Sequence, residues 1–186
     1  VYDGLKYTAL KDIHVAFDAN VGLFKGETCS MDWRTHTYPN WFINSVIADS
    51  FSSGTNALHK FFYQFLGTAG RIIQKPAEEI AMWEKYSGLL KENINKHFWD
   101  EKQGCYTCYL YPEYLGYRPT QRVGVMSNGL AAVLDIATTG QSIQMVENFP
   151  LYPYGAAVLY PSIPDDFSYH NKSVWPVWET PYMYAA

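Results

Sequence analysis

The stretch Thr55–Ile73, which reads TNALHKFFYQFLGTAGRII, decides the fold class because it has the pattern of a long amphipathic helix. Its apolar residues recur every three or four positions, which places them on one broad helical face. These residues are Leu58, Phe61, Phe62, Phe65, Leu66, Ala69, Ile72 and Ile73. Ser53 or Thr55 can cap the first turn with a side-chain oxygen. The stretch therefore predicts a helix that packs against a neighbour.

The next segment, Pro76–His97, predicts a second helix with a narrower buried stripe. The stripe consists of Ile80, Trp83, Ser87, Leu90 and Ile94. Pro76 is well suited to a first helical turn. Ser127–Ala137 repeats the pattern, with Ser127 as the expected cap. Weaker periodicity predicts four further helices, over Tyr2–Ala16, Trp41–Ser50, Gln141–Asn148 and Ser173–Tyr184.

The connections between these helices are long and rich in aromatic residues. Phe98–Tyr111 reads as an extended pair that turns near Gln103 and Gly104, whereas four prolines predict an irregular course for Phe149–Tyr169. No shift in composition divides the chain, so we expect one domain over residues 1–186. The helices predict an all-α fold with a small β-hairpin, and periodicity alone does not choose between a bundle and a toroid.

The composition excludes several classes of protein. The chain has 186 residues, of which 48% are hydrophobic, 17% aromatic and 17% charged. Disordered chains have few aromatic residues, so a folded core is expected. The formal charge of −4 gives no electrostatic reason to expect a nucleic-acid partner. No apolar run reaches the length of roughly 20 residues that a membrane helix needs, so we predict no membrane segment.

The cysteines and histidines predict no metal or cofactor. Cys29, Cys105 and Cys108 form no disulfide framework. The Cys105-x-x-Cys108 spacing occurs in redox motifs and in half of a zinc site, but a zinc site would need a second pair. Two structural thiols in an aromatic hairpin are the favoured interpretation. The five histidines show no metal-ligand spacing.

The stretch Gly26–Trp41, GETCSMDWRTHTYPNW, carries the densest chemistry of the chain. It places two carboxylates, an arginine, a histidine, two tryptophans and a tyrosine between two predicted helices. Carboxyl groups beside flat aromatic faces suit a site that holds a sugar and protonates a glycosidic oxygen. The stretch therefore predicts a carbohydrate-cleaving site. The alternative is a local ion pair between Asp32 and Arg34 that orders the loop.

Three motifs in order resemble those of the (α/α)6 six-hairpin glycosidases. They are Glu27-x4-Asp32-Trp33-Arg34-x3-Tyr38-Pro39, the run GTNALH at 54–59, and Tyr169-His170-Asn171-x3-Trp175-Pro176. The pattern is most similar to that of bacterial relatives of glycoside hydrolase family 63 and of glycogen-debranching glucosidases. The resemblance covers nearly the whole chain. It implies a part of an (α/α)6 toroid in which Asp32 is the general acid, with Arg34 and Tyr38 beside it.

The chain also departs from that family. A complete toroid of six hairpins needs twelve helices, and the sequence predicts seven. The resemblance implies that the general base lies beyond the last motif, so the chain looks like an incomplete domain whose remainder would be its partner. Glu179 is the candidate base within the chain. Alternatively, it is an acidic residue of a first helical turn, which the helix dipole favours.

Aromatic and polar residues elsewhere are candidates for sugar binding. Tryptophan faces can carry a pyranose ring, and polar side chains can bind its hydroxyl groups. The candidates are Glu27, Trp33, Arg34, Tyr38, Gln121, Arg122, His170, Asn171 and Trp175, with Trp41 and Trp178 as further platforms. Several have plainer alternatives: Glu27 can orient the loop, Asn171 can cap a helix, and most tryptophans at helix ends belong to the core. Asn56 is expected to be structural.

The sequence thus predicts a glycoside hydrolase that cleaves an oligosaccharide, with inversion, by general acid and base catalysis. Two alternatives stay open: a non-catalytic sugar-binding or scaffold protein, and an isomerase or lyase on the same toroid. By analogy the family suggests a periplasmic or secreted setting.

Overall fold

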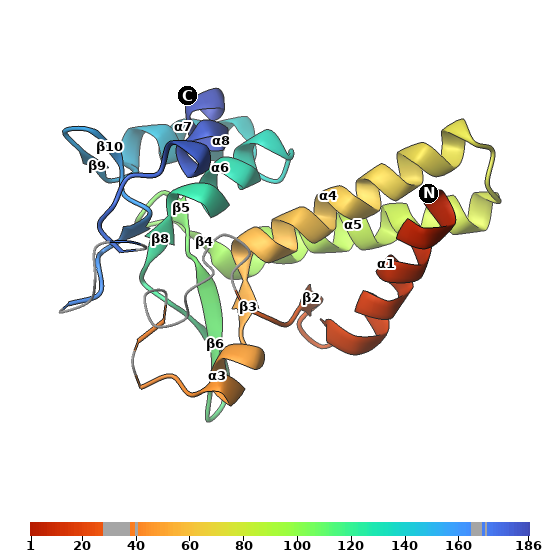
Figure 1. The fold of residues 1–186 in the computed structure, drawn as a ribbon, viewed down its shortest axis with the longest axis horizontal. Coiled ribbons are helices and arrows are strands. Elements are labelled where there is room, and N and C mark those ends of the chain that lie inside the picture. The colour runs from red at the N-terminus through yellow and green to blue at the C-terminus, as the bar shows by residue number, and fades with distance from the viewer. Residues whose placement is uncertain (28–37, 40, 165–168, 170) are drawn as a thin grey trace.

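The computed structural model describes residues 1–27, 38, 39, 41–164, 169 and 171–186. Helices dominate this part of the chain, and short strands join them (Figure 1). The longest elements, α4 (Ser53–Ile72) and α5 (Ala77–Phe98), run side by side and α1 (Tyr2–Ala16) lies against them. The shorter helices α6 (Val125–Val133), α7 (Thr139–Asn148) and α8 (Pro176–Ala185) gather at the other side of the molecule.

The fold consists of one helical unit that occurs three times. In each unit a first helix leads into a tight β-hairpin, a connection follows, and a second helix returns. We call these units the first, second and third repeats, at residues 2–72, 77–133 and 139–185. The hairpins are β1 (Phe17–Asp18) with β2 (Leu23–Phe24), β4 (Trp99–Asp100) with β5 (Cys105–Tyr106), and β9 (Leu151–Tyr152) with β10 (Gly155–Ala156).

The first two hairpins are built in the same way. Asp18 accepts hydrogen bonds from the main-chain N–H groups of Asn20 and Val21, and Asp100 accepts those of residues 102 and 103. Gly22 and Gly104 adopt positive φ angles of 74° and 62°, which glycine reaches without strain. Each hairpin thus reverses the chain after its first helix.

The fourth residue of each second helix fixes the hairpin of its own repeat. The Asn56 side chain accepts a hydrogen bond from Phe24 N at 2.7 Å and donates one to Phe24 O at 3.0 Å. Asn128 makes the same pair of bonds to Tyr106, at 2.7 and 2.9 Å. In the third repeat Glu179 accepts the N–H of Ala156. The structural role expected for Asn56 is confirmed, because both of its amide atoms serve the main chain.

Neighbouring repeats are joined by short strands that precede the second helices. β3 (Phe51–Ser52) pairs with β6 (Tyr109–Glu113), and β8 (Val123–Gly124) pairs with β11 (Leu159–Tyr160). β7 (Gly116–Pro119) extends the first of these sheets. A further helix, α3 (Asn44–Ala48), lies in the first connection. The same joint therefore links the first repeat to the second and the second to the third.

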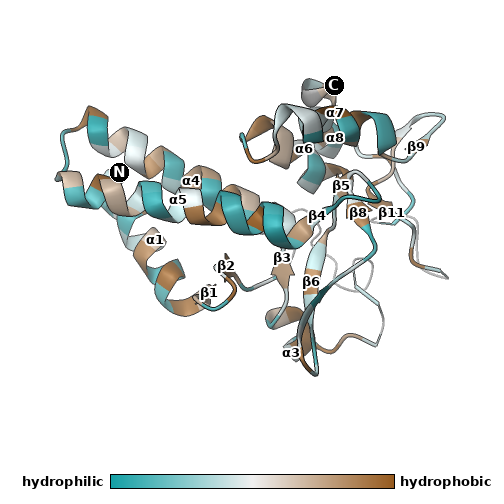
Figure 2. Ribbon diagram, turned by 180° about the vertical axis from the view of Figure 1, so that it is seen from behind, coloured by the Kyte–Doolittle hydropathy of each residue, from teal (hydrophilic) through white to brown (hydrophobic). Residues whose placement is uncertain are grey.

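The main core lies between the long helices, where the Tyr63 and Trp83 rings stack with centroids 5.8 Å apart. Most of the stripe predicted in α5 is buried, as expected. The broad apolar face predicted for α4 is only partly covered, because Leu58, Phe61 and Phe65 are 41 to 46% exposed. Figure 2 shows the mixture of hydrophobic and hydrophilic residues along both helices.

Two expectations about helix caps were wrong. Ser52 caps α4 by accepting the N–H of Thr55, so Ser53 and Thr55 already lie inside the helix. Ser127 is the third residue of α6 and donates its hydroxyl hydrogen to Gly124 O. Among the residues that the structure describes, no helix is both long and apolar enough to span a membrane.

Candidate functional site

The expected acid lies in the first connection, whose two ends the structure describes. Residues 28–37 and 40 lie outside the described part of the chain, so the predictions for Asp32, Trp33 and Arg34 have no geometry here. The same holds for His170. The candidate site is therefore built from the residues that surround these segments.

A pocket of about 180 Å³ opens beside the first connection. Residues of that connection form one wall, and the end of β7 with the chain that leaves it forms the other. Tyr109 and Tyr111 contribute the rest of its lining. The lining residues from the two walls are Pro39, Trp41, Phe42, Arg118, Pro119, Thr120, Gln121 and Arg122. Aromatic faces next to a few polar groups are typical of small-molecule sites.

Trp41 gives this pocket an accessible flat surface. Its side chain is 70% exposed, although it contacts Phe42 edge-on with ring centroids 4.3 Å apart. An indole that is exposed over most of its surface can carry the apolar side of a sugar ring. Trp41 thus suits the platform role considered from the sequence.

Gln121 and Arg122 enter the same pocket from the opposite wall. Gln121 is exposed and Arg122 is half-buried. The Nε of Arg122 is buried and has no hydrogen-bond partner among the described residues. Because that nitrogen is buried, contact between Arg122 and a ligand in the pocket would come from the terminal nitrogens of the guanidinium group. Both residues therefore lie where a ligand hydroxyl could reach them.

Tyr109 forms the inner side of the pocket next to this arginine. Burial raises the pKa of the Tyr109 phenol to about 12, against the opposing effects of Thr120 and the Arg122 charge. The phenol is therefore neutral at physiological pH and can act only as a hydrogen-bonding group.

Tyr38 lies below the pocket rather than in its lining. Its side chain is 2% exposed and packs against Tyr109, with ring centroids 4.8 Å apart. The Phe42 ring lies 6.1 Å from it and 6.2 Å from Tyr109, so the three rings form one cluster. Substrate contact by Tyr38 was expected from the sequence, whereas these contacts give it a supporting position under the aromatic wall.

The residues of the last motif hold the main chain of the third repeat. Asn171 is buried and exchanges two hydrogen bonds with Ile163, accepting its N–H at 2.6 Å and donating to its carbonyl at 2.7 Å. Trp175 is half-buried, donates its indole N–H to Tyr169 O, and stacks on Trp178 with centroids 4.8 Å apart. The contacts of Trp175 agree with its plainer interpretation as a packed residue. Asn171 holds the main chain at Ile163 and does not cap α8, whose N-cap is Trp175.

Glu179 is tied to the third hairpin. Its Oε1 accepts the N–H of Ala156 at 2.5 Å, and a β-carbon at Gly155 would approach that oxygen to 2.6 Å. The glycine therefore leaves the space in which the carboxylate reaches the main chain. Glu179 stands where Asn56 and Asn128 stand in the other repeats.

Glu27 and the two described cysteines occupy contrasting environments. Glu27 is exposed, and its carbonyl accepts a hydrogen bond from Thr55 at 2.8 Å, which holds the connection against α4.

Cys105 and Cys108 are free and buried, and burial raises the pKa of each thiol to about 12. Thiols of this kind are unreactive, in agreement with the structural interpretation. In the described part of the chain no group of His, Cys, Asp and Glu could hold a metal ion.

Two features were missed at the level of sequence. The hairpin pattern aromatic-Asp-x3-Gly-x-aromatic occurs at 17–24 and again at 99–106, and it would have revealed the repeat. The pocket joins Trp41 to residues 118–122, and no local signal connects two segments so far apart in the chain.

Comparisons with known proteins identify the fold. No model of a protein family matches the chain, and no curated protein sequence does. Among solved structures, the chain is similar to neutral trehalase Nth1 from Saccharomyces cerevisiae, with a TM-score of 0.62 and 17% sequence identity. The match covers 75% of this chain and 28% of that chain, so this chain spans little more than a quarter of its neighbour's length. The repeated helical pairs therefore form a toroid-like helical fold, shared with part of that neighbour.

Proposed function

We propose that this chain is part of a glycoside hydrolase that cleaves an oligosaccharide. The observation that carries the proposal is the aromatic and arginine-containing pocket beside the first connection, on a fold shared with a trehalase. The finer assignment is an incomplete (α/α)6 domain from the branch related to glycoside hydrolase family 63 and glycogen-debranching glucosidases. It rests on the three sequence motifs.

In the proposed reaction Asp32 gives its proton to the glycosidic oxygen as the bond from that oxygen to the anomeric carbon breaks. A water oxygen forms the new bond to the anomeric carbon from the opposite face, and a carboxylate base accepts the proton of that water. The product sugar has inverted configuration, and the second product carries the former glycosidic oxygen as a hydroxyl. Arg34 and Trp33 are proposed to contact the sugar beside Asp32, and His170 to bind a hydroxyl group.

The base is proposed to come from outside residues 1–186 rather than from Glu179. The Glu179 carboxylate already accepts a main-chain N–H, which occupies one of its oxygens. The remaining hairpins of the domain are the proposed partner. The exposed apolar residues of α4 support this, because such a row is normally covered.

The pocket would supply part of the binding. Trp41 would carry the face of a sugar ring, while Gln121 and Arg122 would bind its hydroxyl groups from the opposite wall. Glu27 would orient the start of the connection through the bond between its carbonyl and Thr55. Tyr38 and Trp175 would support the aromatic side chains that face the sugar.

The test is Asp32→Asn in the full-length protein, assayed on trehalose, other glucose disaccharides and p-nitrophenyl α-glucoside. Loss of the proton donor should lower kcat at least 10²-fold on the natural disaccharides, while sugar binding by calorimetry stays within threefold. The effect on the aryl glucoside should be smaller, because its leaving group needs less protonation. Asp3→Asn, the same change of charge near the start of α1, is the matched control and should leave kcat unchanged.

The other outcomes separate the alternatives. A wild-type protein that binds these sugars but releases no product would be a binding or scaffold protein. NMR of the first product distinguishes hydrolysis from isomerisation and from a lyase reaction. Only hydrolysis adds water across the glycosidic bond and releases two sugars. Retention of the anomeric configuration would overturn the proposed inverting mechanism.

A further inference from the structure

The pocket beside the first connection has a positively charged lining. Arg118 and Arg122 both line it, whereas no aspartate or glutamate of the described residues does. The whole chain carries a formal charge of −4, so this local excess of positive charge is not the by-product of a basic protein. A cleft lined by charges of one sign concentrates ligands of the opposite sign.

Arg122 keeps its charge without an acidic partner. None of the ion pairs among the described residues includes it. The phenol of Tyr109, which lies next to its guanidinium group, is neutral. Arg118 does pair with Glu113, at 3.2 Å, but both side chains are exposed, and an exposed pair of this kind contributes little. A ligand could therefore draw on both arginines.

Main-chain atoms alone hold Arg122 in place. Its N–H donates to Oγ1 of Thr120 at 3.3 Å, and its carbonyl accepts the N–H of Cys108 at 2.8 Å. The second of these bonds closes the second connection. Neither bond uses the guanidinium group, so the frame does not need an arginine at this position.

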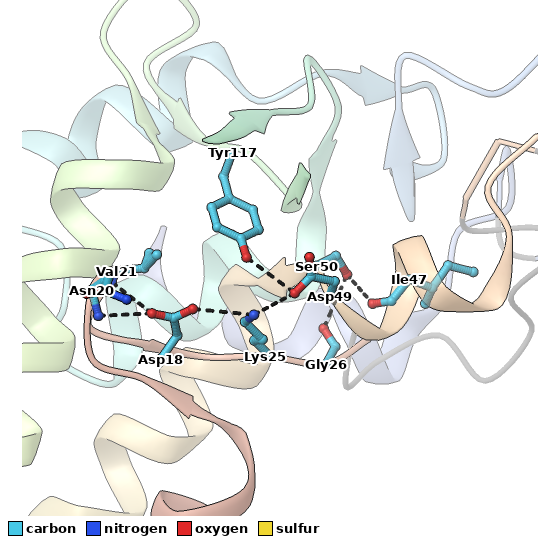
Figure 3. Close-up of polar contacts among 9 residues, drawn as sticks. All are labelled: Asp18, Asn20, Val21, Lys25, Gly26, Ile47, Asp49, Ser50 and Tyr117. Carbon is cyan, nitrogen blue, oxygen red and sulfur yellow. Dashed lines mark hydrogen bonds and ion pairs between the residues drawn. The ribbon is translucent and has the colours of Figure 1, made fainter. Parts of the chain in front are cut away.

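The equivalent residue is a serine in the other two repeats. The bond that closes the connection runs from Gly26 N to Ser50 O in the first repeat and from Val158 N to Ser173 O in the third. Ser50 is buried and donates its hydroxyl hydrogen to Ile47 O at 2.6 Å, so it stabilises its own connection (Figure 3). A long charged side chain at this position is an addition of the second repeat, which forms one wall of the pocket.

The hydrogen-bonding groups of the lining suit an anion better than a neutral sugar. A sugar hydroxyl both donates and accepts, a carboxylate only accepts, and a guanidinium group only donates. The side-chain acceptors of the described lining are the amide oxygen of Gln121 and the hydroxyl oxygens of Thr120 and two tyrosines. Two guanidinium groups therefore leave an excess of donors, which a ligand group that only accepts would satisfy.

We propose that this pocket binds an acidic sugar residue and that Arg122 selects its negatively charged group. The inference rests on the proposed function, because the acidic residue belongs to the oligosaccharide that is cleaved. The planar guanidinium group can present two parallel N–H donors to a carboxylate, and a sulfate or phosphate ester offers the same acceptors. Gln121 contacts a hydroxyl group of the same sugar, and Trp41 contacts its ring.

The size of the pocket limits it to one sugar residue. Its volume of about 180 Å³ is below the roughly 300 Å³ at which sites for drug-sized ligands begin. Single sugars are therefore sufficient probes of the site.

The first test measures the binding of single sugars to the full-length protein by NMR titration. The acidic probes are methyl α-glucuronide and the 6-sulfate and 6-phosphate of methyl α-glucoside, and methyl α-glucoside itself is the matched neutral sugar. We expect at least one acidic probe to bind at least tenfold more tightly than the neutral sugar, and the tightest probe identifies the acidic group. Raising the salt from about 50 to about 500 mM should reduce this preference at least threefold, because salt screens the attraction.

The second test uses variants of the arginine. Arg122→Gln keeps a polar side chain without the charge, and the serines at the equivalent positions indicate that the fold tolerates the change. It should weaken binding of the acidic sugar at least tenfold and that of the neutral sugar less than threefold. Arg122→Lys keeps the charge and should bind the acidic sugar at least threefold more tightly than Arg122→Gln. Arg71→Gln is the matched control, since Arg71 pairs with Glu84 on the long helices, and its preference should stay within twofold of wild type.

Three results would overturn the inference. The first is a wild-type protein that prefers none of the acidic probes, a result that depends on no variant. The second is a preference that persists in Arg122→Gln, and the third is an equal loss in Arg71→Gln, which would mean that the net charge of the chain is responsible.

The outcome for the proposed function is separate. A protein that binds acidic sugars through Arg122 but hydrolyses no oligosaccharide, acidic or neutral, would refute the proposed function and leave the binding site in place. Hydrolysis of neutral oligosaccharides without any preference for acidic sugars would refute only the present inference.

Discussion

Single residues of this chain show how burial decides chemistry. His59 stacks on Phe24 with ring centroids 4.0 Å apart, and burial lowers its pKa below the usual value. His97 is half-buried, and its pKa is lowered for the same reason. Both imidazoles are therefore held neutral in the folded protein at a pH where the unfolded chain already binds a proton.

This difference predicts acid sensitivity. The unfolded chain takes up more protons than the folded protein between the folded and the unfolded pKa of His59, so the free energy of unfolding falls as pH drops through that interval. His59→Phe keeps a flat ring against Phe24 and should lose less stability than wild type between pH 7.5 and pH 5. Urea unfolding at the two pH values measures this. Exposed His14→Asn is the control, and an unchanged pH dependence in His59→Phe would contradict the assignment.

At the scale of elements, the long helices were predicted, whereas the repeat was missed although its first two hairpins share a sequence pattern. α4 and α5 carry uninterrupted periodicity, and the predicted Thr55–Ile73 and Pro76–His97 agree with Ser53–Ile72 and Ala77–Phe98. The repeat depends on a few residues at hairpin turns and on the fourth residue of each second helix. In the third repeat glutamate replaces asparagine, and the hairpin lacks the aspartate. The third hairpin is held by the main-chain pairing of β9 with β10. Main-chain hydrogen bonds of this kind leave little trace in the pattern of side chains along the sequence.

The position of Glu179 leads to a prediction for that element. Because Glu179 serves the third hairpin as Asn56 and Asn128 serve theirs, Glu179→Gln should keep the acceptor for Ala156 N. We expect kcat within threefold of wild type and a free energy of unfolding within about 0.5 kcal/mol. Glu179→Ala should cost about 1–3 kcal/mol, because it leaves that buried N–H without a partner. If a stably folded Glu179→Gln instead loses turnover at least 10³-fold, Glu179 is the general base.

At the scale of the whole molecule, the sequence predicted a helical fold but not the pocket. Composition and periodicity report how much apolar surface must be buried and by which helices. The pocket depends on how the first and second repeats meet, since its two walls come from different repeats. The apolar face of α4 shows the same limit, because its pattern indicates burial while the described residues leave Leu58, Phe61 and Phe65 exposed.

That face gives a prediction for the complete protein. If the remaining hairpins cover α4, Phe65→Asp in the full-length protein buries an unpaired charge and should lower the free energy of unfolding by about 2 kcal/mol or more. Tyr114→Asp, at a fully exposed position of the β6–β7 turn, is the control and should change stability by no more than about 0.5 kcal/mol. Equal, small effects of both variants in thermal and urea unfolding would mean that α4 faces solvent.

The main-chain bond that closes each connection recurs in all three repeats. The connections at 26–50, 108–122 and 158–173 each begin and end on it. The second and third connections also contain β6 and β11, which pair with the preceding repeat, whereas no strand of the described residues lies within 26–50. For an engineer, the bond between Gly26 and Ser50 therefore marks the natural cut point for grafting a foreign loop without breaking a joint between repeats.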